Sequence, residues 1–393
     1  MKKILQLSTY PILKPLHGGQ IRVSKIREFF EKKACIVKSI SLSEMSHMFY
    51  SKDDFLLSAE ELNMLTDTPF STDFATSQIS SKGKAFEFIK KHVISLEPDI
   101  IFLEQVWLWN AVKKLKKQNF ISSDVKIIYS SQNVEYKTKR ALFDSHNIKA
   151  DKIIAQIFEM EKELVQFADT VVACTQDDIE EFKQIGAKDT MLCNNGVSIA
   201  KIDKKISDKL MDDLAGRKYI LFVGSAYPPN ALGFWEMVGN SLAWLPPEYI
   251  VLSVGGVSKI LQDYQKQDSA IFDYVSLDRL KRVGFVSEKL LSSLLYNATV
   301  IILPITVGGG SNLKTAEAIA SLRPVVATSK ACRGFDFTDK LSNFKIRDDR
   351  ASFIEAIQGF LGKKVDLSLL ESEKRLRMTV NWENTLEPLK KFI

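Results

Sequence analysis

Short apolar runs alternate with segments of helical periodicity along the whole chain. In the first half, the strand-like runs are Lys3–Ser8, Cys35–Leu42, Asp99–Glu104, Lys126–Ser130, Thr170–Cys174 and Met191–Cys193. Between them apolar residues recur at helical spacing, as Ile21, Ile26 and Phe29 do after the first run. Short buried strands that alternate with helices predict a parallel sheet covered by helices on both faces.

The same pattern restarts in the second half of the chain. Its strand-like runs are Tyr219–Val223, Tyr249–Val254, Leu280–Val283, Val300–Leu303, Val325–Thr328 and Lys345–Arg347. Between the halves, residues 194–203 combine turn-forming residues with no periodicity, which is typical of a linker. Because 393 residues exceed one typical core, we predict two α/β domains, residues 1–198 and 199–377. The C-terminal helix, about residues 378–393, can pack back on the first domain.

Regular periodicity is interrupted between residues 43 and 84. Long irregular insertions in α/β domains are often functional. An apolar acceptor or a membrane surface can dock on the methionine and aromatic side chains of this insertion, which are Met45, Met48, Phe49, Tyr50 and Phe55. The alternative is that these side chains close over the core of their own domain, and the sequence leaves both interpretations open.

The composition is ordinary for a globular protein, with 45% hydrophobic and 26% charged residues. A net charge of +6 is compatible with anionic substrates or an anionic membrane surface, but it is too small to indicate a nucleic-acid partner. The four cysteines form no C-x-x-C motif and the four histidines are scattered, so we expect buried thiols, a reducing compartment and no metal site. The start, MKKILQLSTYPIL, is interpreted as a strand rather than a signal peptide, and no apolar run approaches the ~20 residues of a membrane span. We therefore expect a cytoplasmic protein.

Three consecutive glycines, Gly308 to Gly310, follow the apolar run Val300–Leu303 and precede a segment of helical spacing. Glycines let the backbone approach a ligand, and the first amides of a helix have no internal partner, so this unit suits an anion. Ser311 can cap the helix or donate to a phosphate oxygen, and Lys314 can add a positive charge. The Glu317 carboxylate can accept two ribose hydroxyls. The alternative is an ordinary strand–helix–strand connection with an exposed lysine and glutamate.

Two further clusters follow strand-like runs of the first half. Gly18 and Gly19 come after the first run, where ligands of open α/β sheets bind, and His17 beside them is interpreted as an exposed loop residue. Gln132, Asn133 and Glu135 follow the run Lys126–Ser130 and are placed for a site. The alternative for the second cluster is that Asn133 caps a helix with Glu135 in its first turn.

At this point the chain resembles the retaining transferases of glycosyltransferase family 4, which have the GT-B fold of two Rossmann-like domains. The matching strings are Gly18-Gly19 with Arg22, Asn133-Val134-Glu135, Ala168-Asp169 with Thr175, Asn195-Gly196-Val197, Phe222-Val223-Gly224 with Pro229-Asn230, Gly284-Phe285-Val286-Ser287, Ala298–Pro304, Gly308–Ala318 and Arg323–Thr328. They cover nearly the whole chain, and the specific part is the stretch Gly308–Thr328 together with the strand before it.

The resemblance implies that the second domain binds a nucleoside diphosphate sugar and the first binds the acceptor. The implied donor-binding residues are Gly18, Gly19, Gly224, Asn230, Phe285, Val286, Gly309, Gly310, Ser311, Asn312, Leu313, Lys314 and Glu317. In this set Glu317 would hold the ribose, the residues around Lys314 the diphosphate, and Gly18-Gly19 would close over the phosphates. The implied acceptor-binding residues are Gln132, Asn133 and Glu135, and the implied catalytic residues are Lys314 and Asn133.

The chain departs from the family pattern at several of these positions. Gly309 stands where many members carry a glutamate, Asn312 where relatives often have arginine, and Gln132 where relatives often have histidine. The loop after Gly224 also lacks the arginine and lysine that many members have there. Each change removes a charge or a proton donor near the expected substrates, and Lys314 remains.

The resemblance therefore implies transfer of a sugar, with retention of its anomeric configuration, to a hydroxyl of a growing glycan. The basic net charge and the methionine and aromatic residues of the 43–84 segment indicate a lipid-linked acceptor and peripheral contact at the inner face of a membrane. No Asp-x-Asp motif occurs, so we expect neither a metal ion nor a cofactor. The alternatives are an inverting enzyme or a sugar-nucleotide epimerase of the same fold, or a non-catalytic nucleotide-sugar-binding partner of another transferase. A dinucleotide oxidoreductase is disfavoured because no G-x-G-x-x-G follows the first strand of either domain.

Overall fold

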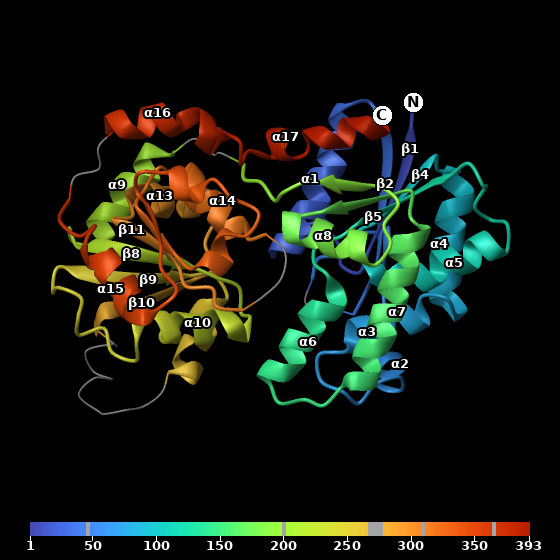
Figure 1. Cartoon of the computed structure of the whole chain (residues 1–393), viewed down its shortest axis with the longest axis horizontal. Helices are drawn as coiled ribbons and strands as arrows, with labels where there is room; N and C mark the ends of the chain where they lie inside the picture. Colours follow the sequence, from blue (N-terminus) through green and yellow to red (C-terminus); the bar gives the residue numbers. More distant parts are fainter. Residues whose placement is uncertain (45–47, 199–201, 266–277, 308–310, 364–366) are drawn as a thin grey trace. The chain divides into compact units, whose positions relative to one another are not determined.

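The computed structural model describes residues 1–44, 48–198, 202–265, 278–307, 311–363 and 367–393 (Figure 1). The chain divides into two compact units, which we call the N-terminal unit (Met1–Asn194 with Thr385–Ile393) and the C-terminal unit (Asn195–Asn384). This division falls within the linker expected between the two domains. The segment that returns to the N-terminal unit begins at Thr385, so it is shorter than the helix expected over residues 378–393.

The N-terminal unit is built on a seven-stranded parallel sheet in the order β3-β2-β1-β4-β5-β6-β7. Its strands are β1 (Lys3–Ser8), β2 (Ile36–Ser43), β3 (Asp54–Leu56), β4 (Ile100–Leu103), β5 (Lys126–Ser130), β6 (Thr170–Ala173) and β7 (Thr190–Leu192). The chain builds outward from β1 to β3, then restarts on the other side of β1 with β4. The order therefore reverses between β1 and β4, which is where open α/β sheets bind ligands.

Helices and short helical turns connect these strands. They are α1 (Gly18–Lys32), α2 (Ala59–Asn63), α3 (Thr72–Ile79), α4 (Gly83–Leu96), η1 (Val106–Leu108), α5 (Trp109–Lys117), α6 (Glu135–Ser145), α7 (Asp151–Phe167), α8 (Gln176–Gln184) and the C-terminal η5 (Glu387–Phe392).

The prediction of an irregular insertion over residues 43–84 is wrong, because this segment forms β3, α2 and α3. Leu57, Leu62 and Phe74 belong to the core, and Phe55 packs against it. These side chains serve their own unit, whereas Phe49 is about half exposed and Met45 lies outside the described residues.

The C-terminal unit repeats the design with six parallel strands in the order β10-β9-β8-β11-β12-β13. The strands are β8 (Lys218–Val223), β9 (Tyr249–Val254), β10 (Leu280–Gly284), β11 (Val300–Leu303), β12 (Val325–Ala327) and β13 (Phe344–Ile346). The helices are α9 (Lys204–Asp213), α10 (Pro228–Val238), α11 (Val257–Ile260), η2 (Leu261–Tyr264), α13 (Glu288–Asn297), α14 (Leu313–Ala320), η3 (Ser329–Cys332), η4 (Thr338–Lys340), α15 (Arg350–Gln358), α16 (Leu367–Met378) and α17 (Trp382–Thr385). The order reverses between β8 and β11.

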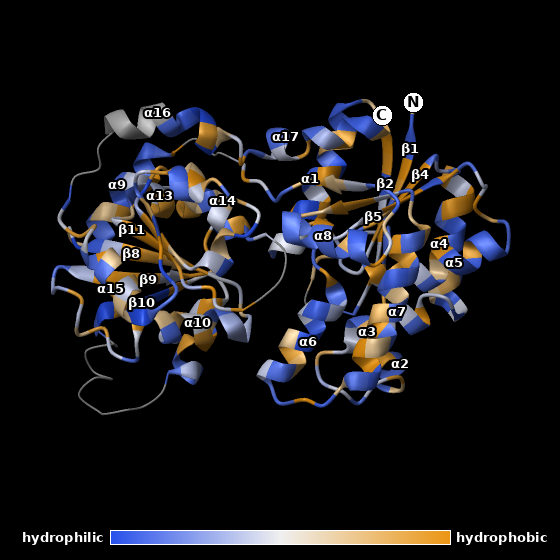
Figure 2. Cartoon of the chain, viewed as in Figure 1, coloured by the Kyte–Doolittle hydropathy of each residue, from blue (hydrophilic) through white to orange (hydrophobic). Residues whose placement is uncertain are grey.

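The strands are the most apolar part of each unit (Figure 2). In the C-terminal unit, alternate residues of β11 face opposite cores: Ile301 and Leu303 lie in one, Val300 and Ile302 in the other. Both faces of the sheet are covered, so every residue of this strand is buried, and each such side chain stabilises the fold by about 1.5–3 kcal/mol. This explains why the strand reads as a continuous apolar run. The fold class is therefore as predicted, two parallel-sheet α/β units.

The four cysteines are buried free thiols. In the described ranges, no helix combines the length and the apolar character that crossing a membrane requires. Within the same ranges, no group of three or more His, Cys, Asp or Glu side chains is arranged to hold a metal ion.

Candidate functional site

The switch point of the C-terminal unit joins two residues that are 84 positions apart. Lys314 lies on α14, which follows β11, and Asn230 lies on α10, which follows the neighbouring β8. Lys314 Nζ donates a hydrogen bond to Asn230 Oδ1 over 2.8 Å. Asn230 Nδ2 in turn donates to the Ser225 carbonyl and hydroxyl, at 3.1 and 3.2 Å. A cation is thus held at the carboxyl ends of two adjacent strands, as the position of open-sheet ligand sites requires.

Lys314 and Glu317 are partly buried and influence each other's charge. Burial lowers the pKa of Lys314 to about 8, and the Glu317 carboxylate opposes this shift. Burial raises the pKa of Glu317 to about 7, and the Lys314 ammonium opposes that shift. A phosphate bound beside Lys314 would favour its charged form, because an opposite charge offsets the cost of desolvation.

The start of α14 differs from the prediction that Ser311 caps it. The helix begins at Leu313, Asn312 occupies the N-cap position, and the Asn312 side chain makes no capping bond. Ser311 instead packs inside its own unit: its hydroxyl accepts from the Asn195 amide at 3.1 Å, and its carbonyl accepts from Asn195 Nδ2 at 2.7 Å. The Ser311 hydroxyl proton is still free to donate to a phosphate oxygen.

The first amides of α14 are available to a ligand. The amides of Thr315 and Ala316 donate to the Asn312 carbonyl, so those of Leu313 and Lys314 have no acceptor inside the helix. Asn312 Nδ2 is buried without a partner among the described residues. These donors form a positively polarised surface at the helix start. The predicted contacts Gly309 and Gly310 lie outside the described residues.

Glycines hold the neighbouring loops together. The Gly224 amide donates to Val254 O at 2.9 Å, and the Gly255 amide donates to Gly284 O at 2.7 Å. A Cβ atom on Gly256 would lie 2.6 Å from the Ala226 amide nitrogen, so no side chain fits there. A Cβ atom on Gly255 would likewise lie 2.4 Å from Gly224 O, so the loops after β8 and β9 approach each other closely because Gly255 and Gly256 carry no side chain.

Phe285 follows this glycine cluster at the end of β10. Its side chain is 65% exposed, and Lys259 Nζ lies 5.6 Å from the ring centroid. Val286, by contrast, packs against the core. The resemblance implies that both residues bind the donor, and the structure adds an exposed aromatic face at Phe285 on which a base can stack.

In the N-terminal unit, Gly18 and Gly19 lie in the first turn of α1 rather than in a loop. The prediction that His17 is an exposed loop residue is wrong: it is the N-cap of α1, where Nδ1 accepts from the Gln20 amide at 3.5 Å. The His17 ring packs edge-on against Tyr10, with 4.8 Å between ring centroids. The helix cap and the ring contact therefore fix the start of α1 against the segment that follows β1.

The predicted residues after β5 meet the loop that follows β1. Gln132 Oε1 accepts a hydrogen bond of 2.5 Å from the Tyr10 hydroxyl. The alternative that Asn133 caps α6 is wrong, because the N-cap is Val134 and the Asn133 side chain bonds to the Glu135 carboxyl.

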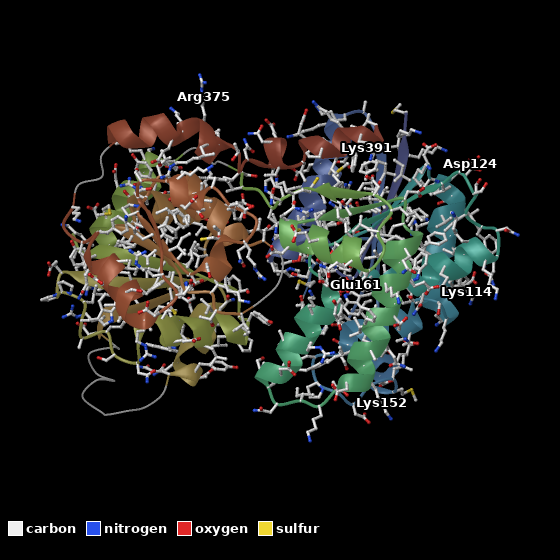
Figure 3. All side chains as sticks on the ribbon, viewed as in Figure 1. Lys114, Asp124, Lys152, Glu161, Arg375 and Lys391 are labelled. Atoms are coloured by element: carbon white, nitrogen blue, oxygen red, sulfur yellow. The ribbon has the colours of Figure 1, made fainter. Side chains whose placement is uncertain are left out.

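A buried carboxylate on α7 caps α6 instead. Glu161 accepts from the amides of Glu135 and Tyr136, at 3.0 and 3.1 Å, and from the Tyr129 hydroxyl at 2.7 Å (Figure 3 labels Glu161). Burial raises the pKa of Glu161 to about 7, although these donors oppose the shift. Burial also raises the pKa of Glu135 to about 8, and the charges of Glu161 and Asp73 add to it.

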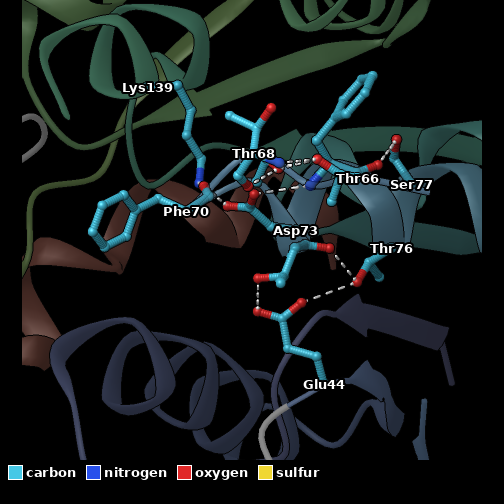
Figure 4. Close-up of polar contacts among 11 residues, drawn as sticks. Glu44, Thr66, Thr68, Phe70, Asp73, Thr76, Ser77 and Lys139 are labelled. Atoms are coloured by element: carbon cyan, nitrogen blue, oxygen red, sulfur yellow. Dashed lines mark hydrogen bonds and ion pairs between the residues drawn. The ribbon is translucent and has the colours of Figure 1, made fainter. Parts of the chain in front are cut away.

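One lysine balances this acidic region. Lys139 lies 2.5 Å from an Asp73 carboxylate oxygen and donates to the Phe70 carbonyl at 2.7 Å (Figure 4). On the far side of Asp73, Glu44 accepts from the Thr72 and Thr76 hydroxyls, and burial raises its pKa. The N-terminal site is thus rich in carboxyl and amide groups.

The sequence pointed to neither Tyr10 nor Glu161. Tyr10 lies just after β1, so its place at the carboxyl edge of the sheet was a usable signal. Glu161 lies mid-helix on α7, 26 residues from its partner Glu135, and no motif marks it.

Comparisons with known proteins bear on both units. Residues 217–363 match the family model described as Glycosyl transferases group 1. This segment contains Asn230, Phe285, Lys314 and Glu317, so the candidate donor residues lie within a glycosyltransferase domain, and the chain is a glycosyltransferase. A search of curated proteins found no match.

Solved structures resemble the chain over its whole length. A sucrose-phosphate synthase from Thermosynechococcus elongatus has a TM-score of 0.74 at 15% identity, covering 100% of this chain and 98% of that one. Anabaena HepE in complex with UDP-glucose has a TM-score of 0.68 at 16% identity, with 100% of both chains covered. A UDP-forming trehalose-phosphate synthase from Burkholderia xenovorans has a TM-score of 0.67 at 14% identity, covering 100% and 98%. At such identities the likeness shows the fold, which is GT-B.

Proposed function

We propose that the chain is a retaining glycosyltransferase of family 4, which moves a sugar from a nucleoside diphosphate sugar to a hydroxyl of a glycan, glycolipid or other acceptor. The observation that carries the proposal is the Lys314–Asn230 contact at the switch point of the domain that matches group 1 glycosyl transferases. The complexes of Anabaena HepE with UDP and with UDP-glucose support a nucleotide sugar as donor.

The donor diphosphate is assigned to the start of α14. The amides of Leu313 and Lys314, the Ser311 hydroxyl and the Lys314 ammonium would donate to its oxygens. As the bond between the sugar and the diphosphate breaks, negative charge grows on the leaving phosphate, and fixed donors stabilise it without reorganisation. One such donor typically lowers the barrier by about 3 kcal/mol. The Glu317 carboxylate would accept from the ribose hydroxyls.

The acceptor hydroxyl oxygen then bonds to the anomeric carbon on the face that the diphosphate leaves. Its proton passes to the leaving phosphate oxygen, so no protein nucleophile is required and the anomeric configuration is retained. The acceptor is assigned to the N-terminal unit near Gln132, Asn133 and Glu135. A lipid-linked acceptor at the inner face of a membrane belongs to the same proposal, and the net charge of +6 supports an anionic partner.

A binding experiment tests the donor site. Thermal shift against UDP, GDP, ADP and their glucose conjugates should identify a nucleotide that stabilises the wild type, because a ligand that binds only the folded state raises Tm. Lys314→Ala and Glu317→Gln should each weaken that binding at least about tenfold, and Lys289→Ala, an exposed lysine on α13, should leave it unchanged. Unchanged affinity in both site variants would refute the donor site.

A transfer experiment tests the reaction. NMR of the product should show the anomeric configuration of the donor sugar. An inverted product would identify an inverting enzyme, and an isomerised nucleotide sugar would identify an epimerase. Donor binding with no turnover across a panel of glycan acceptors would instead identify a non-catalytic partner.

A further inference from the structure

A buried amide donor, Gln132 Nε2, has no acceptor among the described residues of the N-terminal unit. A buried amide that donates to nothing costs about 1–3 kcal/mol. Gln132 Oε1, in contrast, is satisfied by the Tyr10 hydroxyl at 2.5 Å. The amide is therefore oriented, with its acceptor end used by the protein and its donor end unused.

The surroundings of Tyr10 stabilise this orientation of the Gln132 amide. Burial raises the pKa of Tyr10 well above its usual value, and the charges of Glu104 and Glu135 raise it further. The residue therefore remains a neutral hydroxyl that can donate its proton. Its ring is held edge-on by His17, and the neighbouring Gln105 side chain accepts from the Thr9 amide at 3.1 Å. The Tyr10 hydroxyl thus joins the segment that follows β1 to the segment that follows β5.

Gly19 leaves the room that this pair needs. A Cβ atom at residue 19 would lie 2.5 Å from Gln132 Oε1 and nearer still to the Tyr10 hydroxyl. Gly19 lies within α1 without a left-handed backbone conformation, so the requirement is for space and not for an unusual φ. This gives the second glycine a role inside its own unit.

The surroundings favour a neutral partner for the free donor. The charged groups that act on the Tyr10 hydroxyl are the carboxyls of Glu104 and Glu135. Burial raises the pKa of both carboxyls, so neither supplies a charge that would offset the cost of burying a phosphate or carboxylate here, whereas an uncharged sugar hydroxyl can accept from an amide and donate to a carboxyl oxygen.

We propose that Tyr10 is a positioning residue that orients the Gln132 amide, so that Nε2 donates to a hydroxyl oxygen of a neutral acceptor sugar. The inference rests on the proposed function and adds the acceptor's chemical class, an uncharged sugar ring, at this point of contact. Tyr10 itself touches Gln132 and does not contact the reacting atoms.

A double-mutant cycle tests the inference. The variants are Tyr10→Phe, Gln132→Ala and the pair, and the probes are methyl glycosides of glucose, galactose, mannose and N-acetylglucosamine. For the glycoside that the wild type uses best, Tyr10→Phe should raise the acceptor KM about fivefold, leave the donor KM unchanged and lower Tm no more than the matched tyrosine control does. In the Gln132→Ala background the same change should have no further effect, because Tyr10 acts only through Gln132. Gly19→Ala should also raise the acceptor KM, because its Cβ atom would displace the Tyr10 hydroxyl from Gln132 Oε1.

Tyr219→Phe is the matched control, since it also removes a buried tyrosine hydroxyl, which donates to Leu294 O in the C-terminal unit. Additive losses in the double variant, no loss in Tyr10→Phe, or a wild type that accepts only sugar phosphates would each overturn the inference. A wild type that binds no nucleotide would overturn the proposed function first, and the thermal-shift screen detects that outcome separately.

Discussion

The two switch points use one scaffold for opposite chemistry. In the C-terminal unit, a cation and the start of a helix gather after β8 and β11, with one carboxylate a turn further along α14. In the N-terminal unit, carboxyls, amides and a tyrosine hydroxyl gather after β1, β4 and β5. The first collection suits a diphosphate and the second suits sugar hydroxyls. The difference teaches that the sheet fixes where a site lies, while a few side chains after the strands fix its charge.

The largest expected effect removes the cation from the C-terminal site. Lys314→Ala should lower kcat/KM for the nucleotide sugar about 10²–10³-fold, because one fixed donor to the leaving group is lost. Lys314→Arg, which keeps the charge, should recover part of that loss. Steady-state kinetics with the nucleotide sugar identified by thermal shift provides the measurement. Equal activity in the alanine variant and the wild type would contradict the assignment of the diphosphate to the cationic switch point of the C-terminal unit.

The next effect concerns the carboxylate that orders the N-terminal site. Glu161→Leu should lower the free energy of unfolding by about 3 kcal/mol, since two helix amides and the Tyr129 hydroxyl lose their acceptor. Denaturant unfolding gives the energy, and hydrogen exchange at the amides of Glu135 and Tyr136 should quicken. Glu159→Leu, at an exposed position of the same helix, serves as the control and should change neither.

A smaller effect is the pH dependence of stability that Glu135 gives to the N-terminal unit. The pKa of Glu135 is raised by burial from 4.5 to about 8, so the folded state holds a proton that the unfolded state releases. Its contribution to stability is complete below the unfolded pKa and is lost as pH rises through the folded pKa, by up to ~1.4 kcal/mol per pH unit. Glu135→Gln should therefore flatten the fall in stability between about pH 5 and 8. An unchanged pH profile would contradict the burial of this carboxyl, and exposed Glu159→Gln is the control.

The smallest effect concerns the exposed ring in the C-terminal unit. Phe285→Ala should weaken nucleotide binding about fivefold through lost stacking on the base. Stability should barely change, because the side chain is 65% exposed. Val283→Ala, at a half-exposed position on β10 two residues earlier, should leave binding intact. Calorimetric titration with the nucleotide alone isolates this contact from the sugar.

The periodicity predicted most of the fold because both sheets are buried on two faces and their strands read as apolar runs. The prediction was wrong over residues 43–84, where β3 has only three residues and its burial pattern is not continuous. Short edge strands carry too few residues for a period to show.

The candidate sites, too, were predicted only in part: the sequence named residues but not the contacts between them. Lys314, Asn230 and Gln132 were named from local strings and resemblance, yet their contacts span 84 and 122 positions. Such pairings depend on strand order, which no local pattern encodes. The prediction that Ser311 caps α14 was wrong for a similar reason. Its hydroxyl oxygen accepts a hydrogen bond from the Asn195 amide, which is 116 positions away in the sequence.

The returning segment Thr385–Ile393 has a consequence for synthesis. Leu389 is buried in the N-terminal unit, Phe392 packs edge-on against Phe102 at 5.6 Å between centroids, and Lys391 pairs with Asp189 at 2.6 Å (Figure 3). These residues are synthesised after the seven strands of the unit that they complete. The N-terminal unit therefore stays incompletely packed until residues 385–393 have been synthesised, and a nascent chain stalled before codon 385 would expose the surface that these residues cover.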